Sequence, residues 1–116
     1  MTKDEAVLLM ATLSERVGVK APRLVWSTRS KNGRYKAGVV VVGPRAWRGV
    51  HDCILHELAH HVAWVYQLRE GWTRRGQGPH GPRFRRALLD VVAADGWNYA
   101  WESEYRALRG LGESGK

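Results

Sequence analysis

Three residues in a short apolar segment have the types and spacing of a metal-binding catalytic motif. His56, Glu57 and His60 form an HExxH pattern within residues 53–62. On an α-helix, residues four positions apart lie on one face about one turn apart, so the two imidazoles can bind a single metal ion. Glu57 lies beside that face, where its carboxylate can reach a water molecule on the ion. The pattern predicts two zinc ligands and the general base of a zinc peptidase.

A hydrolytic zinc site takes three protein ligands and keeps one position for water, so a third ligand is needed. Metzincins have Gly and His three and six residues beyond the motif, where this chain has Ala63 and Tyr66. The carboxylates of Glu102 and Glu104 do not begin an ExxxD pattern. His80 therefore remains as the predicted third ligand, with one zinc ion per chain.

The segments around these residues predict a small α+β domain. Thr2 to Glu5 fits a capping box that begins a helix, and Gly18 favours its end. The HExxH helix is expected to begin near residues 47–50 and to end near Arg69, on the basis of its apolar stripe. Pro82 favours the start of a further helix that ends at residues 95–96, and a final helix is expected over residues 97–109.

Two strands are expected between the first helix and the HExxH helix. Residues 23–27 form the first, residues 35–42 the second, and the Asn32-Gly33 pair predicts a tight hairpin turn between them. The four valines at 39–42 indicate burial on both faces of the sheet. The alternative is that the edge of this sheet holds a substrate peptide through backbone hydrogen bonds.

Length and composition indicate one small domain of 116 residues, which we assign to residues 1–109 with a polar tail at 110–116. Cys53 is the only cysteine, which excludes a disulfide framework and a cysteine zinc ribbon. The first residues lack the pattern of a signal peptide, and no apolar run approaches the roughly 20 residues of a membrane span. We expect a cytoplasmic monomer that does not enter a membrane.

The net charge of +8 is concentrated in two segments that flank the HExxH helix. Residues 16–48 contain Lys and Arg but no acid, and residues 69–86 add arginines against Glu70 alone. Such a distribution favours an acidic partner, most often nucleic acid, although a basic surface can also serve solubility alone.

The HELAH segment at 56–60, followed by HGPRF at 80–84, resembles the SprT-like (Spartan-type) metallopeptidase family, whose signature is HExxH and then HGxxF. The resemblance implies a minimal zincin-like core in which His56, His60 and His80 bind zinc and Glu57 is the catalytic base. It further implies that Gly81 and Phe84 shape the turn and the packing at the third ligand. It covers roughly residues 20–95 and rests on two short motifs.

Members of that family are linked to proteolysis of proteins that are bound or crosslinked to DNA. The chain has no zinc ribbon, which bacterial relatives commonly carry, so single-stranded or damaged DNA would have to bind the basic segments of the core itself. The arginines nearest the motifs are the expected phosphate contacts: Arg74, Arg75, Arg83, Arg85 and Arg86.

Several roles stay open. Asp52 fits either a hydrogen bond to the ring of His56 or an acid in the first helical turn. The candidate donors to the oxyanion are His61, Tyr66, Arg83 and Tyr99. Trp26, Trp47, Trp64 and Trp101 are expected in or near the core, and Trp72 could stack on an unpaired base.

Two other functions compete with the peptidase. A DNA-binding module with a structural zinc site would not require Glu57, and an interaction protein with an accidental HExxH would bind no metal.

Overall fold

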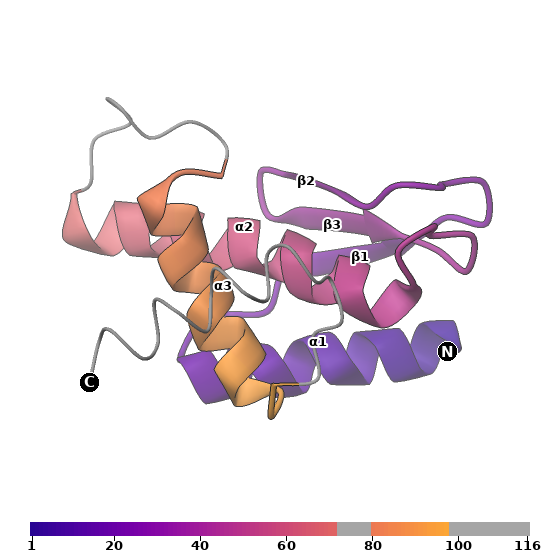
Figure 1. Ribbon diagram of the computed structural model, residues 1–116, viewed down its shortest axis with the longest axis horizontal. Coiled ribbons are helices and arrows are strands. Elements are labelled where there is room, and N and C mark those ends of the chain that lie inside the picture. Colours follow the sequence, from indigo (N-terminus) through magenta and orange to yellow (C-terminus); the bar gives the residue numbers. More distant parts are fainter. Residues whose placement is uncertain (72–79, 98–116) are drawn as a thin grey trace.

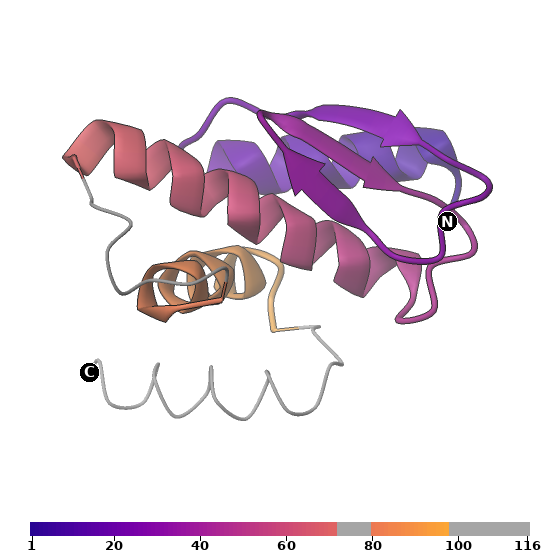
Figure 2. The ribbon, with the colours of Figure 1, turned by 90° about the horizontal axis from the view of Figure 1, so that it is seen from above.

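The computed structural model describes residues 1–71 and 80–97. Within these ranges the chain forms three helices around a small sheet, in the order α1 Lys3–Val17, β1 Arg23–Trp26, β2 Arg34–Lys36, β3 Val39–Val42, α2 Val50–Glu70 and α3 Pro82–Ala94. Figures 1 and 2 show α2 at the centre, with the sheet on one side of it and α3 on the other. The α+β layout is therefore as the sequence predicts. The final predicted helix lies outside the described residues, except for Trp97.

The helix boundaries follow the capping residues. The hydroxyl of Thr2 accepts the backbone N–H of Glu5 at 3.2 Å, and the Glu5 carboxylate accepts the N–H of Thr2 at 2.9 Å. Gly18 ends α1 in the left-handed conformation, with φ 79°. Pro82 occupies the first turn of α3, where its missing N–H costs nothing. The predicted capping box, the helix end at Gly18 and the helix start at Pro82 are confirmed.

The strand pairing differs from the prediction. The strands lie in the order β1-β3-β2, β1 runs parallel to β3, and β2 runs antiparallel to it. The tight turn is at Ala37 and Gly38, whose φ angles of 49° and 82° suit a two-residue hairpin loop. The prediction of a hairpin turn at Asn32-Gly33 was wrong. Residues 35–42 contain parts of two strands, and the Asn-Gly pair belongs to the connection that leads to β2.

The valines of β3 are buried unequally. Val40 and Val42 are fully buried, whereas Val39 and Val41 are half-buried. The prediction of burial on both faces is confirmed for the face of Val40 and Val42 and only in part for the face of Val39 and Val41. The reason is that the helices lie on one side of the sheet (Figure 1). β3 contacts α2, so this strand connects the sheet to the helix that carries HExxH.

The apolar core joins all three helices to the sheet. Its fully buried large side chains come from α1, β3, α2 and α3: Met10, Leu13, Val40, Val42, Ile54, Leu55, Leu58, Val62, Leu88, Val91 and Val92. In the described part of the chain, no helix combines the length and the hydropathy needed to span a membrane.

The tryptophans divide between core and surface. Trp26 packs half-buried against the core, as predicted, but Trp47 is 65% exposed and Trp64 is 37% exposed. The prediction that Trp47 lies in or near the core was wrong, because this residue lies in the loop before α2 and not in the helix. Trp72 and Trp101 lie outside the described residues.

Candidate metal centre

The structure brings the three predicted ligands together. His56 and His60 lie one turn apart on α2, and His80 lies just before α3. Ligand atoms of the three side chains all lie within 4.8 Å of one another. The Nε2 atoms of His56 and His80 are 3.2 Å apart. Two nitrogens on a tetrahedral zinc ion, each about 2.0 to 2.1 Å from the metal, would be roughly 3.3 Å apart, so the spacing fits the ion.

Phe84 forms the apolar support of this cluster. Its ring centroid lies 5.0 Å from that of His56, 4.3 Å from His60 and 4.8 Å from His80, and its side chain is buried. Phe84 lies in the first turn of α3, three residues after the glycine that precedes the helix. Contact with all three imidazoles restricts their rotation and excludes water from one side of the site.

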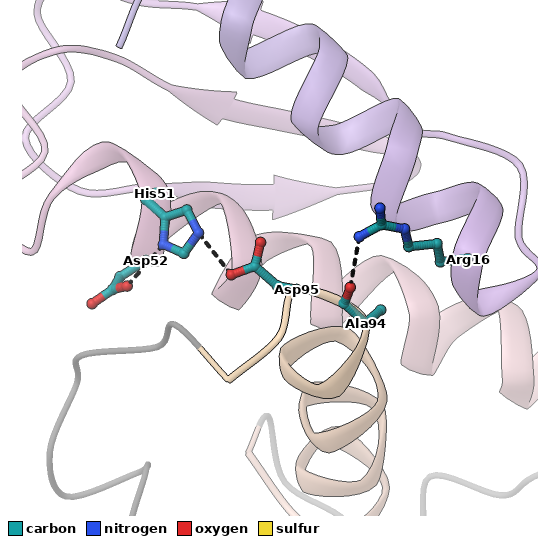
Figure 3. Close-up of polar contacts among 5 residues, drawn as sticks. All are labelled: Arg16, His51, Asp52, Ala94 and Asp95. Carbon is teal, nitrogen blue, oxygen red and sulfur yellow. Dashed lines mark hydrogen bonds and ion pairs between the residues drawn. The ribbon is translucent and has the colours of Figure 1, made fainter.

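Two polar contacts hold the far end of α3, as Figure 3 shows. His51, in the first turn of α2, places its Nε2 atom 2.8 Å from Oδ2 of Asp95. Arg16 of α1 donates to the carbonyl oxygen of Ala94 at 2.9 Å. These contacts connect the C-terminal end of α3 to α1 and to the first turn of α2.

Asp52 is buried in the first turn of α2, and its Oδ1 atom lies 3.3 Å from Nδ1 of His51 (Figure 3). An acid at this position is favoured by the positive end of the helix dipole. The second role considered for Asp52, a hydrogen bond to His56, stays a prediction.

Glu57 is buried beside the histidine cluster, with 6% of its surface exposed. Its Oε2 atom has no hydrogen-bond partner among residues 1–71 and 80–97. Burial raises the pKa of the Glu57 carboxyl, and the neighbouring charges of His56 and Arg48 act in the opposite direction. A buried carboxylate with unused acceptor capacity is suited to take a proton from a water molecule or a substrate.

Gly33 explains how the chain approaches this carboxylate so closely. A Cβ atom at position 33 would lie 2.9 Å from Cγ of Glu57 and 3.5 Å from Cβ of Cys53. The backbone before β2 therefore lies directly against α2 at Glu57, and a side chain at position 33 would collide with Cγ of Glu57. The Asn-Gly pair marks a close backbone approach at the site.

The histidines and Glu57 open onto a cleft of about 600 Å³. Seven of its lining residues were not predicted as site residues. Six of them come from the connection to β2, from β2 itself and from the segment 47–53: Asn32, Gly33, Arg34, Trp47, Arg48 and Cys53. Tyr35 of β2 also lines the cleft, so the edge strand of the sheet borders the candidate site.

Two of the candidate oxyanion donors use their polar atoms elsewhere. His61 contacts Tyr35 and the carbonyl oxygen of Lys20, and Tyr66 donates to Asp90. Neither His61 nor Tyr66 lines the cleft, and the same is true of Arg83. Tyr99 lies outside the described residues.

The predicted phosphate contacts lie near the third ligand in sequence but not on the cleft. Arg83, Arg85 and Arg86 are in the first two turns of α3, where Arg85 and Arg86 are exposed and Arg83 is half-buried. Arg74 and Arg75 lie outside the described residues. The arginines that line the cleft are instead Arg34 and Arg48.

No family model, no curated protein and no solved structure matches the chain. The resemblance to the SprT-like family therefore rests on the HExxH and HGxxF motifs.

Proposed function

We propose that this chain is a zinc-dependent peptidase of the SprT-like type that acts on proteins near or crosslinked to DNA. The observation that carries the proposal is the convergence of His56, His60 and His80 within 4.8 Å beside the buried carboxylate of Glu57. Three imidazoles are a donor set typical of zinc, and three protein ligands are typical of hydrolytic sites.

A zinc ion held by these histidines would polarise a peptide carbonyl and lower the pKa of water to about 7. Glu57 accepts the proton of the attacking water and passes it to the amine that leaves when the peptide bond breaks. The direction of the Glu57 pKa supports this assignment, because burial strengthens the carboxylate as a base.

Strand β2 offers a way to position the substrate. It lies at the edge of the sheet, and its residues Arg34 and Tyr35 line the cleft. An extended peptide that pairs with this edge would pass along the histidine cluster, held by backbone hydrogen bonds that tolerate many side chains.

The competing function, a DNA-binding module with structural zinc, is less well supported. Structural zinc sites have four protein ligands, and the cluster found within residues 1–71 and 80–97 has three. Such a module also has no use for a buried carboxylate next to the metal. The basic charge of +8 is compatible with both functions and is the support for DNA as a partner.

The test is cleavage of an unfolded protein by the zinc-loaded protein, with and without single-stranded DNA. Glu57→Gln should retain zinc but lose at least about a hundredfold in rate, since general base catalysis typically contributes 10² to 10⁴. Glu70→Gln, which changes an exposed acid at the end of the same helix, is the matched control and should cleave normally. If Glu57→Gln cleaved as fast as the parent, the peptidase proposal would be wrong.

A further inference from the structure

One wall of the cleft is built from two loops that are distant in sequence. The backbone N–H of Trp47 donates to the carbonyl oxygen of Lys31 at 3.1 Å, and its indole Nε1 donates to Oδ1 of Asn32. Trp47 and Asn32 both line the cleft. These bonds connect the segment before β2 to the segment before α2, so the wall is a built feature of the site.

Arg48 is held against this wall by its neighbour. Its Cζ atom lies 4.6 Å from the centroid of the Trp47 ring, which is 65% exposed. A guanidinium stacked on an indole is attracted by the face of the ring, which restricts the orientation of its plane. The Nε atom of Arg48 is buried, so the two terminal Nη groups are the ones that can donate a pair of hydrogen bonds to a carboxylate.

The charges around the cleft are predominantly positive. Among residues 1–71 and 80–97, Arg34 and Arg48 line it together with one acid, Glu57, which is buried. A divalent cation on the histidines would make the cleft more positive still. Such a site repels cationic side chains and attracts anionic ones.

A peptide fits this cleft better than a nucleic acid does. The cleft is bordered by the edge of β2, whose backbone N–H and C=O groups pair with another peptide strand. Its volume of about 600 Å³ suits a few residues of an extended chain. A substrate strand along β2 would carry its side chains past Arg34 and towards the wall at Arg48.

We propose that Arg48, stacked on Trp47 and assisted by Arg34, binds the carboxylate of an Asp or Glu side chain close to the scissile bond. The cleft would therefore select acidic segments of unfolded protein. This inference rests on the proposed peptidase function and assigns its substrate class.

The test measures binding, so that it does not depend on cleavage. Two fluorescently labelled ten-residue peptides, one with central Asp and Glu residues and one with Asn and Gln in their place, are titrated with zinc-loaded Glu57→Gln protein. Fluorescence anisotropy should show the acidic peptide binding about fivefold more tightly at low salt, with the advantage shrinking as salt is added.

Adding Arg48→Gln to that protein should abolish the preference for the acidic peptide. Arg45→Gln is the matched control, because Arg45 is exposed in the same loop and does not line the cleft. It should leave the preference intact. Arg34→Gln, a change at an exposed position, should reduce the preference and serves as the second variant if Arg48→Gln does not fold.

Three results would overturn the inference: equal affinity for the two peptides, no binding of either, or an equal effect of Arg45→Gln and Arg48→Gln. A labelled single-stranded oligonucleotide is titrated in parallel. If Arg48→Gln weakened its binding and left the acidic peptide unaffected, the wall would be a phosphate site and the inference would be wrong. Failure of the peptidase proposal is distinguishable, because it appears as absent cleavage by the parent.

Discussion

His60 and His61 are adjacent in sequence but lie in different surroundings. They are separated by about 100° of helix rotation. The ring of His60 faces those of His56 and His80, with centroids 5.1 and 5.0 Å away. His61 instead contacts Tyr35 through Nδ1 at 2.8 Å and the carbonyl of Lys20 through Nε2 at 2.9 Å. Histidines whose nitrogens converge are suited to a metal, whereas a histidine bonded at both nitrogens to fixed groups stabilises the fold.

The contacts of His61 determine its tautomer. A carbonyl oxygen only accepts, so Nε2 carries the proton that is donated to Lys20. Nδ1 then accepts from the hydroxyl of Tyr35, and the oxygen of that hydroxyl accepts the N–H of Gly38 at 2.9 Å. Burial lowers the pKa of His61, which favours the same neutral form. The result is a chain of bonds between α2, strand β2 and the turn at residues 37–38.

The largest expected effect is on zinc affinity when each of the two histidines is replaced in turn by alanine. His60→Ala should weaken zinc binding at least about a hundredfold, because three ligands share a binding free energy on the order of 10 kcal/mol. His61→Ala should leave zinc affinity within a few-fold of the parent. Competition with a chromogenic chelator measures both constants. Equal losses in the two variants would contradict the distinction between ligand and structural histidine.

The second prediction concerns stability without metal. His61→Phe removes both hydrogen bonds and leaves the carbonyl of Lys20 and the hydroxyl of Tyr35 without this partner, which should cost about 2 to 3 kcal/mol. Urea unfolding of the chelated protein measures the free energy. His80→Ala is the control, since this exposed histidine should contribute little to the metal-free fold. If His80→Ala destabilised the metal-free protein as much as His61→Phe, the assignment of a structural role to His61 alone would be wrong.

The elements that carry the site were predictable because local signals specify them. The spacing of His56 and His60, the capping box at Thr2 and the position of Pro82 depend on residues within one helical turn. His80 was predictable as a third ligand because the motifs that could supply another candidate were absent. Such signals reach a few residues along the chain, and they identified the clustered histidines and the helices that position them.

The sheet and the cleft wall depend on contacts that local patterns do not contain. The Asn32-Gly33 pair resembles a hairpin turn, but its glycine is needed where the backbone lies against Glu57. Trp47 is a large hydrophobic residue of the kind found in cores, yet its indole donates a hydrogen bond to Asn32 and lines the cleft. In both cases residues far apart in sequence determine the conformation, so periodicity gave no indication of it.

The smallest predicted effect is on the stability contributed by Tyr66, a residue of α2 whose hydroxyl forms a hydrogen bond within the fold. Its hydroxyl donates to Oδ2 of Asp90 at 3.0 Å and connects α2 to α3. Burial, together with the charge of Asp90, raises the pKa of Tyr66 from 10.0 to about 12. The folded protein therefore keeps this proton at pH values where the unfolded chain loses it. The stability that results is fully present below pH 10 and is lost as the pH rises through about 12.

Tyr66→Phe should lower the free energy of unfolding by about 1 kcal/mol at pH 8, as expected for one partly buried hydrogen bond. Between pH 10 and 12 the difference in stability between parent and variant should shrink, because the parent alone loses the contribution of Tyr66. Urea unfolding at a series of pH values measures this difference, and groups common to both proteins cancel. Zinc affinity should not change, since Tyr66 does not line the cleft. A difference that stayed constant from pH 8 to 12 would show that the Tyr66 hydroxyl is not held by Asp90.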